Sequence, residues 1–313
     1  MPLRFPIPLL RLFASHELPF KDALLARAGV WSHEPWRHAR PRTCRGKWHG
    51  SRMTFDLRDF HQRAAYLFGR LMDVPVQLAI LNAARPGDIF VDVGANIGVL
   101  TLLGAHAVGP AGTVIAFEPN PEVFKRLDAH VRDNRRSNVR LFPLALSDRE
   151  GVLQLSIPPT GNTGAATLGT LPARHGGRAH ARYDVPVKLG DDLLGDAPPH
   201  PRPMLVKIDA EGHEPNVLRG MSRTIAARRP AILAEINPEA LAGNGATPAD
   251  ALDPLLALGY RPHYLGARWG RWSRRWTLVL RPAPTVWRSP RAGNLLLLPA
   301  DGPWRDRLAR RMA

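Results

Sequence analysis

The residues best suited to chemistry near the start of the chain are Asp92, Gly94, Asn96 and Gly98, in the segment FVDVGANIG. A short apolar run ends there in an acid and enters a turn that holds two glycines. Glycine allows a sharp turn and lets a ligand approach the backbone closely, because it has no Cβ. In an open α/β sheet, ligands collect where such a strand ends and a helix begins. The segment therefore predicts a cofactor-binding turn; the alternative is a plain strand-to-helix turn.

The spacing of the glycines indicates which cofactor. A dinucleotide site needs G-x-G-x-x-G, so that a pyrophosphate can rest on the helix N-terminus; here Asn96 takes the second glycine's place and the pattern is G-x-x-x-G. The Asp92 carboxylate suits a cationic amino-acid group. Glu118, 26 residues after Asp92, ends a second apolar run, where an acid accepts hydrogen bonds from two ribose hydroxyls. A ribose acceptor without a phosphate cradle favours S-adenosylmethionine over NAD, and the alternative is an ordinary βαβ unit with incidental acids.

Ser147 and Asp148 end a third apolar run, where the adenine of such a cofactor would lie. Asp148 could accept a hydrogen bond from the adenine amino group. It could equally form a turn by bonding its own backbone, as aspartate often does. The sequence leaves both interpretations open.

A fourth apolar run, MLVKID, is followed by further acids and a histidine. Methyl transfer is an in-line displacement, so positioning contributes most of the catalysis, and a hydroxyl acceptor gains from a base that takes its proton. We predict Asp209, Glu211 and His213 as candidate bases and Lys207 as a partner of Asp209 or Glu235. His213 could instead be a satisfied surface or capping residue.

The sequence does not establish a metal site. Asp209, Glu235 and Asn237 carry the oxygen atoms that Mg²⁺ prefers, but their spacing is not diagnostic, and no metal is predicted. Cys44 is the only cysteine, which excludes an internal disulfide and a cysteine-ligated zinc. A reducing, cytoplasmic setting is therefore expected.

Composition is consistent with a globular enzyme. The 313 residues are 44% hydrophobic, and no apolar run reaches the roughly 20 residues of a membrane span. The proline- and arginine-interrupted start is a poor signal peptide. The net charge of +16 favours a polyanionic partner. However, only five of the 43 basic residues are lysines. A codon bias that favours arginine explains the basic excess as well as a binding surface does.

The Arg- and Trp-rich segment 268–276 suits nucleic-acid binding, stacking on sugars, or a simple hairpin, which we favour. Asn237 begins NPEA, which lacks the second proline and the aromatic of amino-methyltransferases that act on bases; this argues against a nucleobase substrate.

The pattern of elements predicts a doubly wound, mostly parallel α/β sheet with helices on both faces. Apolar periodicity indicates helices at 51–84, 99–106, 121–134, 215–228 and 248–258. It indicates strands at 90–93, 113–118, 139–146, 204–209, 231–236, 261–265 and 277–280. Residues 151–186 break the alternation and are predicted to be an insertion over the carboxyl edge of the sheet. We expect a basic N-terminal appendage (1–50), one main domain (51–300) and a basic C-terminal tail (301–313).

Four blocks, VDVGANIG, AFEPNP, ALSD and VKIDAEGHEPNVLRG, together resemble the FkbM-type S-adenosylmethionine-dependent methyltransferases. The likeness runs from about residue 85 to about 240, and His130 stands where the family has asparagine. It implies the class I methyltransferase fold and O-methylation of a hydroxyl on a glycan or a polyketide-like natural product. A nucleic-acid methyltransferase and a catalytically inactive binding module are the alternatives. The acceptor, metal dependence and oligomeric state are left open.

Overall fold

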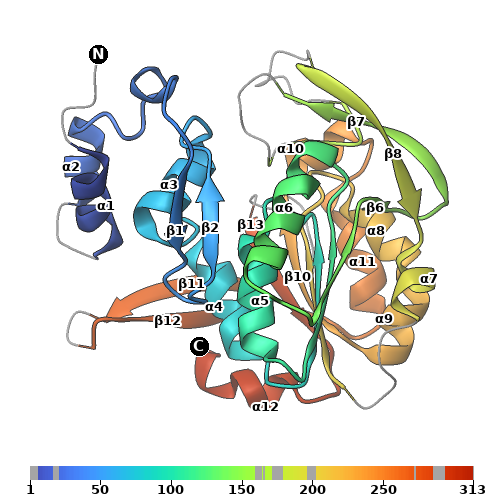
Figure 1. Ribbon diagram of the computed structural model, residues 1–313. Coiled ribbons are helices and arrows are strands. Elements are labelled where there is room, and N and C mark those ends of the chain that lie inside the picture. The colour runs from blue at the N-terminus through green and yellow to red at the C-terminus, as the bar shows by residue number, and fades with distance from the viewer. Residues whose placement is uncertain are drawn as a thin grey trace.

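The computed structural model describes residues 6–16, 21–158, 164, 166–170, 179–195, 202–270, 273–284 and 293–312. Its centre is an eight-stranded sheet with the order β12-β11-β13-β10-β9-β3-β4-β5 (Figure 1). The five strands from β10 to β5 are mutually parallel, whereas β13, β11 and β12 join antiparallel. The strands are β3 (Ile89–Val93), β4 (Thr113–Phe117), β5 (Val139–Phe142), β9 (Met204–Ile208), β10 (Ala231–Ile236), β11 (Arg261–Gly270), β12 (Arg275–Pro282) and β13 (Gly293–Leu298).

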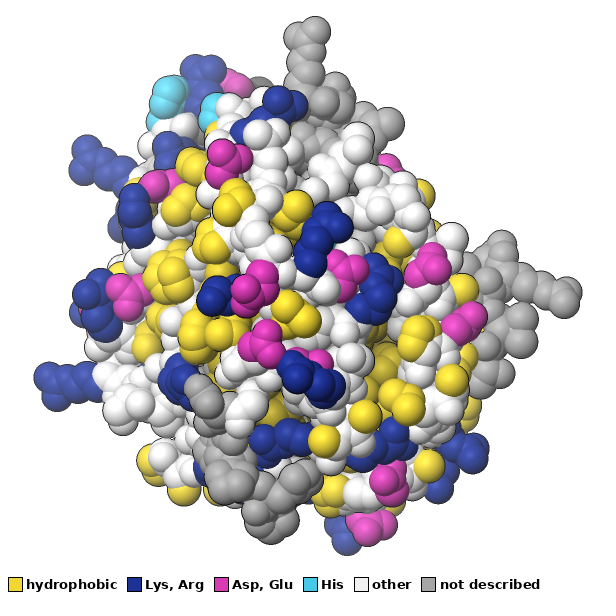
Figure 2. Space-filling model, turned by 90° about the vertical axis from the view of Figure 1, so that its right-hand side faces the viewer, with side chains coloured by type: hydrophobic (Ala, Val, Ile, Leu, Met, Phe, Trp, Pro, Cys, Tyr) yellow, Lys and Arg dark blue, Asp and Glu magenta, His cyan; other side chains and the backbone are white. Residues whose placement is uncertain are grey.

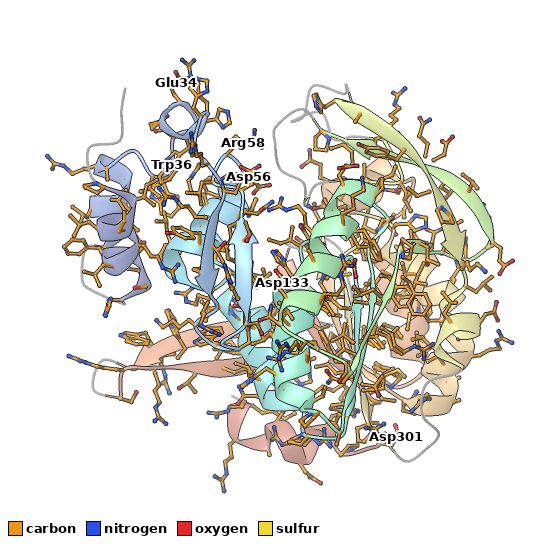
Figure 3. The ribbon with its side chains drawn as sticks, in the orientation of Figure 1. Glu34, Trp36, Asp56, Arg58, Asp133 and Asp301 are labelled. Carbon is orange, nitrogen blue, oxygen red and sulfur yellow. The ribbon has the colours of Figure 1, made fainter. Side chains whose placement is uncertain are left out.

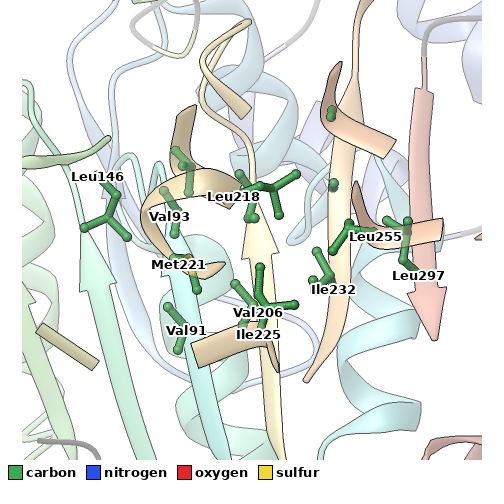
Figure 4. Packing of buried hydrophobic residues seen from close by; sticks show 14 of the residues in the cluster. Val91, Val93, Leu146, Val206, Leu218, Met221, Ile225, Ile232, Leu255 and Leu297 are labelled. Carbon is green, nitrogen blue, oxygen red and sulfur yellow. The ribbon is translucent and has the colours of Figure 1, made fainter. Parts of the chain in front are cut away.

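Helices cover both faces of this sheet, because neighbouring strand residues point alternately to either side. On one face, Val91, Val206 and Ile232 pack against Met221 and other apolar side chains (Figure 4). The predicted doubly wound α/β architecture is therefore confirmed. That face is covered by α8 (Glu214–Gly220), α9 (Ser222–Arg228) and α11 (Pro248–Ala257), and the other by α4 (Val74–Ala83), α5 (Val99–Val108) and α6 (Pro121–Asp133).

The N-terminal segment is built into the core. The boundary predicted at residue 50 falls in the turn between β1 (Arg42–Arg45) and β2 (Arg52–Phe55). Leu25 and Trp36, from before that turn, are fully buried in one apolar cluster with residues of α5 and α6. This segment lies beside the main sheet in Figures 1 and 3, where Trp36 is labelled. Its helices are α1 (Ile7–Ser15) and α2 (Lys21–Arg27), and α3 (Phe60–Phe68) follows β2.

The last residues also pack on the main body. Trp304, in α12 (Trp304–Leu308), is buried, and Arg307 forms an ion pair with the Asp88 carboxylate before β3. The described part of the predicted tail is thus anchored to the start of the first strand of the sheet.

The predicted insertion forms a second, three-stranded sheet with the order β6-β8-β7. It contains β6 (Ala145–Leu146), β7 (Gly151–Ile157) and β8 (Ala181–Lys188). The strand predicted at 139–146 is therefore divided between two sheets, because β6 leaves β5 to pair with β8. Residues 159–163, 165 and 171–178 of the insertion lie outside the described residues.

Two helix predictions need correction. The helix predicted at 51–84 begins as β2, and only then come α3 and α4. The helix predicted at 215–228 is divided into α8 and α9 at Met221. The Arg/Trp segment is confirmed as a hairpin end, in which Gly270 pairs with Arg275 and Trp269 with Trp276. The remaining short helices are α7 (Gly190–Leu194) and α10 (Pro238–Gly243).

Candidate active site

A cavity of about 360 Å³ opens at the carboxyl ends of β3, β4, β9 and β10. Parallel strands bring their carboxyl ends to one edge, and the residues predicted to do chemistry follow those strands. Of the eleven predicted site residues, the lining includes Gly94, Asn96, Glu118, Lys207, Asp209, Glu211 and His213.

Close packing against other parts of the protein requires glycine at both positions of the turn. Gly94 has φ +75°, and a Cβ there would lie 1.9 Å from the Asp209 carbonyl oxygen. Gly98 has φ +89°, does not line the cavity, and packs against Leu127 of α6. Asn96 also adopts a positive φ, of 49°. The turn therefore brings the end of β3 directly against the end of β9.

Glu118 is held ready to accept hydrogen bonds. The Asn96 amide donates to its Oε2 at 2.7 Å and the Asn120 amide to its Oε1 at 2.9 Å. A carboxylate has about four lone-pair sites, so each oxygen keeps capacity for a ribose hydroxyl. Burial raises the pKa of Glu118 to about 7. The residue fits the predicted ribose acceptor in position and chemistry.

Asp92 is fully buried and contacts Thr101 and Lys207 instead of the cavity. Its Oδ2 accepts from Thr101 Oγ1 at 2.7 Å, and its Oδ1 lies 3.2 Å from Lys207 Nζ. It is outside the cavity lining, so a direct contact with the cofactor's amino-acid group receives no support from this geometry.

Lys207 joins the ends of β3 and β9. Its Nζ donates to the Val93 and Gly94 carbonyl oxygens at 3.1 and 2.8 Å and lies 3.6 Å from Asp209 Oδ2. Burial would lower the pKa of Lys207, but the nearby Asp92 and Asp209 carboxylates raise it overall. The predicted pairing of Lys207 with Asp209 is present.

Asp209 and Glu235 form a hydrogen-bonded carboxylate pair in the cavity wall, at the ends of adjacent strands. The nearby Asp209 charge, followed by burial, raises the pKa of Glu235 well above its ordinary value, as expected when two carboxyl groups lie side by side. Asp209 is partly exposed to the cavity, with 37% of its side-chain surface accessible.

The structure gives no support to a metal site in the described residues. There, no three His, Cys, Asp or Glu side chains are grouped to hold a metal ion. Asn237 instead caps α10, where its Oδ1 accepts from the Glu239 and Ala240 amides.

The residues predicted at the adenine edge face another way. Ser147 and Asp148 do not line the cavity. Asp148 accepts from Asn216 Nδ2 at 3.2 Å and from Arg219 Nε at 3.1 Å, since β6 carries it towards α8. The structure therefore favours a role for Asp148 in joining β6 to α8 through these polar contacts. The cavity wall near β4 and β6 is apolar and is formed by Phe117, Pro119, Leu144, Leu146 and Val217.

His213 is neutral near pH 7. Its Nε2 lies 3.0 Å from Ser147 Oγ, and burial lowers its pKa to about 4. It lines the cavity, and its Nε2 is already within hydrogen-bond distance of the Ser147 hydroxyl.

Cavity residues from distant elements escape prediction from the sequence. His61 and Gln62 come from α3, Asp73 precedes α4, and Asn294 begins β13. Asn294 Nδ2 donates to Asp73 Oδ2 at 2.7 Å. None of these four follows a strand at the carboxyl edge, so the strand-end pattern does not reveal them.

His130, where the resemblance led us to expect asparagine, lies outside the cavity lining. Its Nε2 accepts from the Thr54 amide at 3.0 Å, which leaves Nδ1 to donate to the Ile97 carbonyl oxygen at 2.8 Å. His130 thus fastens the cofactor turn to β2.

The fold and cavity define a class I methyltransferase, a class that uses S-adenosylmethionine. The chain belongs to the methyltransferase FkbM domain family, whose model matches residues 92–262, more than half of its length.

Two curated relatives to which the chain is similar are named as methyltransferases. The chain is 30% identical over 223 residues to 31-O-demethyl-FK506 methyltransferase FkbM of Streptomyces tacrolimicus, covering 59% of this chain and 82% of that protein. It is 30% identical over 148 residues to hexuronic acid methyltransferase AglP of Haloferax volcanii, covering 47% of this chain. The chain spans 55% of the length of that relative.

Among solved structures, a methyltransferase FkbM from Methylobacillus flagellatus aligns with a TM-score of 0.42 at 14% identity, over 88% of this chain and 60% of that one.

None of the helices in the described part of the chain is long and apolar enough to cross a membrane.

Proposed function

We propose that the protein transfers a methyl group from S-adenosylmethionine to a hydroxyl oxygen of a glycan or polyketide-like acceptor, in a reducing cytoplasm. The observation that carries the proposal is Glu118, whose carboxylate is fixed by two backbone amides and keeps a lone pair on each oxygen at the cavity wall. The names of the two relatives support a hydroxyl-bearing acceptor.

S-adenosylmethionine would supply an electrophilic methyl group on its sulfonium. Glu118 would hold the ribose, and the turn of Gly94 and Asn96 would lie under the amino-acid end. Asp209, partly exposed, would accept the proton of the acceptor hydroxyl as the oxygen–methyl bond forms and the sulfur–methyl bond of the donor breaks, which leaves the demethylated cofactor as a neutral thioether. Lys207 Nζ, 3.6 Å from Asp209 Oδ2, would help to hold this carboxylate in place.

Calorimetry of cofactor binding tests the first half of the proposal. The methyl donor and its demethylated product should bind, whereas NAD should not. Because burial raises the pKa of Glu118 to about 7, the carboxyl is protonated below that pH and accepts poorly. Affinity should therefore rise between pH 6 and pH 8. Glu118→Gln should cost on the order of 2–4 kcal/mol of affinity at pH 8 and weaken this pH dependence.

Glu122→Gln provides a matched control, because Glu122 is an exposed acid on α6 that pairs with Lys125 one turn along the same helix. It should leave cofactor affinity unchanged. Tight NAD binding without a response to the demethylated product would remove the cofactor assignment.

Transfer itself is tested by incubating the protein and labelled methyl donor with cell extract, followed by mass spectrometry of the labelled products. Label in a base-stable ether of a sugar or polyketide supports the proposal. Label recovered only in RNA or DNA would favour the nucleic-acid alternative, and cofactor binding without any label would favour an inactive binding module.

A further inference from the structure

The part of the cavity beyond the cofactor turn is lined by carboxylates from separate elements. Asp209 and Glu211 follow β9, Glu235 ends β10 and Asp73 precedes α4. We call these four residues the acidic wall. All four line the cavity to which Asp209 is accessible, and an acceptor hydroxyl must enter this cavity to react.

Positive charge is scarce at this place. Lys207 is the only lysine or arginine among the described residues that line the cavity. Its Nζ is 3.2 Å from the buried Asp92 carboxylate and donates to two backbone carbonyls, so its charge is largely balanced from below. This contrasts with the chain as a whole, which carries +16.

The carboxylates lie close enough to affect one another's pKa values. Asp209 is the largest cause of the raised pKa of Glu235, and Glu211 and Glu214 add to it. Asp209 also contributes to the raised pKa of the buried Glu214, after burial itself. Carboxylates that line one cavity create a negative potential in the space they enclose.

We infer that the acidic wall selects hydroxyl acceptors that carry a cationic amine and disfavours acceptors that carry a carboxylate or phosphate. This inference rests on the proposed O-methyl transfer and names the chemical class of its acceptor. An ammonium group next to the reacting hydroxyl would be attracted by the wall, whereas an anion would meet like charges without a described arginine to pair with. An acceptor of the hexuronic acid type, as in the name of the Haloferax relative, would be a poor substrate.

Three matched acceptors test this inference: a methyl hexoside, its 2-amino counterpart and its uronic acid. The full chain is assayed with labelled methyl donor at pH 7.5, and kcat/KM is measured for each. We expect the amine to exceed the neutral sugar, and the neutral sugar to exceed the uronate, by about tenfold at each step, as for roughly 1.4 kcal/mol of electrostatic preference. Added salt should reduce these ratios, since it screens charge.

Variants assign the preference to the wall. Asp73→Asn and Glu211→Gln each remove one charge from its rim, and each should lower the amine-to-uronate ratio several-fold. Glu122→Gln removes the same charge from the outer surface of α6 and should leave the ratio unchanged.

The outcomes separate the inference from the function on which it rests. Methylation of the uronate or the neutral sugar in preference to the amine overturns the inference while keeping O-methyl transfer. A preference for the amine that persists unchanged in both wall variants also overturns it. Cofactor binding without methylation of any hydroxyl acceptor, in this panel or in extract, overturns the proposed function and the inference together.

Discussion

Lys207 connects two strands, a buried acid and the candidate base, so its charge should matter for folding. Lys207→Met would leave Asp92 buried with a charge that Thr101 alone cannot balance. Removing one partner of a buried ion pair typically costs about 3–5 kcal/mol. Urea denaturation should show a loss of that size. Lys125→Met is the control: its pair with Glu122 is exposed and should contribute less than about 1 kcal/mol. Equal losses for the two variants would contradict a central role for Lys207.

Asp209 is the candidate base for the acceptor hydroxyl. Asp209→Asn should keep cofactor affinity within a few-fold and lower turnover by roughly 10²–10⁴-fold, the range for a lost general base. Raising the pH should partly restore the rate, because a fraction of the acceptor then ionises unaided. Calorimetry and single-turnover assays measure the two quantities. A nearly silent Asp209→Asn, combined with loss of activity in EDTA, would instead assign activation of the acceptor to a metal.

At the scale of elements, the contact between β3 and β9 determines where the turn can lie. Gly94→Ala would place a Cβ 1.9 Å from the Asp209 carbonyl oxygen, at φ +75°. Gly87 has φ +92°, and a Cβ added there would meet nothing within 4 Å, so Gly87→Ala carries only the backbone cost, about 1 kcal/mol. Thermal unfolding should therefore show a clearly larger loss for Gly94→Ala, by about 2 kcal/mol or more, with weaker cofactor binding. Similar melting temperatures would show that β9 can move away.

Local patterns predicted the elements whose environment is simple. The strands β3, β4, β9 and β10 are almost wholly buried and read as short apolar runs. The bounds of β10 are those predicted for it. Residues 139–146 gave one apolar run, yet they form two strands, because the partner that draws β6 away lies beyond residue 180. The same long-range pairing moved Asp148 from the expected adenine edge to Arg219.

The candidate site divides in the same way. Glu118 and Asp209 could be predicted, since each ends a strand at the carboxyl edge. His61, Asp73 and Asn294 could not, because α3, α4 and β13 reach the cavity only through tertiary packing.

For the molecule as a whole, the large positive charge does not mark a continuous basic face on the side shown in Figure 2. There, lysine and arginine side chains alternate with aspartate and glutamate over the visible surface. Ion pairs such as Arg58 with Asp56, labelled in Figure 3, neutralise some of the basic side chains locally. The mixed charge of the visible surface does not favour the nucleic-acid alternative.

The N-terminal segment should be inseparable from the methyltransferase body. Trp36 is fully buried, its Nε1 donates to the Gly29 carbonyl oxygen at 3.2 Å, and the Arg63 guanidinium lies over its ring. Because its cluster includes Ile97 of the cofactor turn, Trp36→Ala should cost about 3–5 kcal/mol and reduce cofactor affinity as well. Melting curves followed by fluorescence and by cofactor binding should shift together.

Trp269→Ala, in the exposed half of the β11–β12 hairpin, is the matched control and should shift neither curve by more than a few degrees. If residues 1–50 were an independent appendage, Trp36→Ala would instead produce a separate early transition and leave cofactor binding untouched. A single cooperative transition is expected, because helices α1 to α3 share one apolar cluster with α5 and α6 and cannot lose their packing without exposing it.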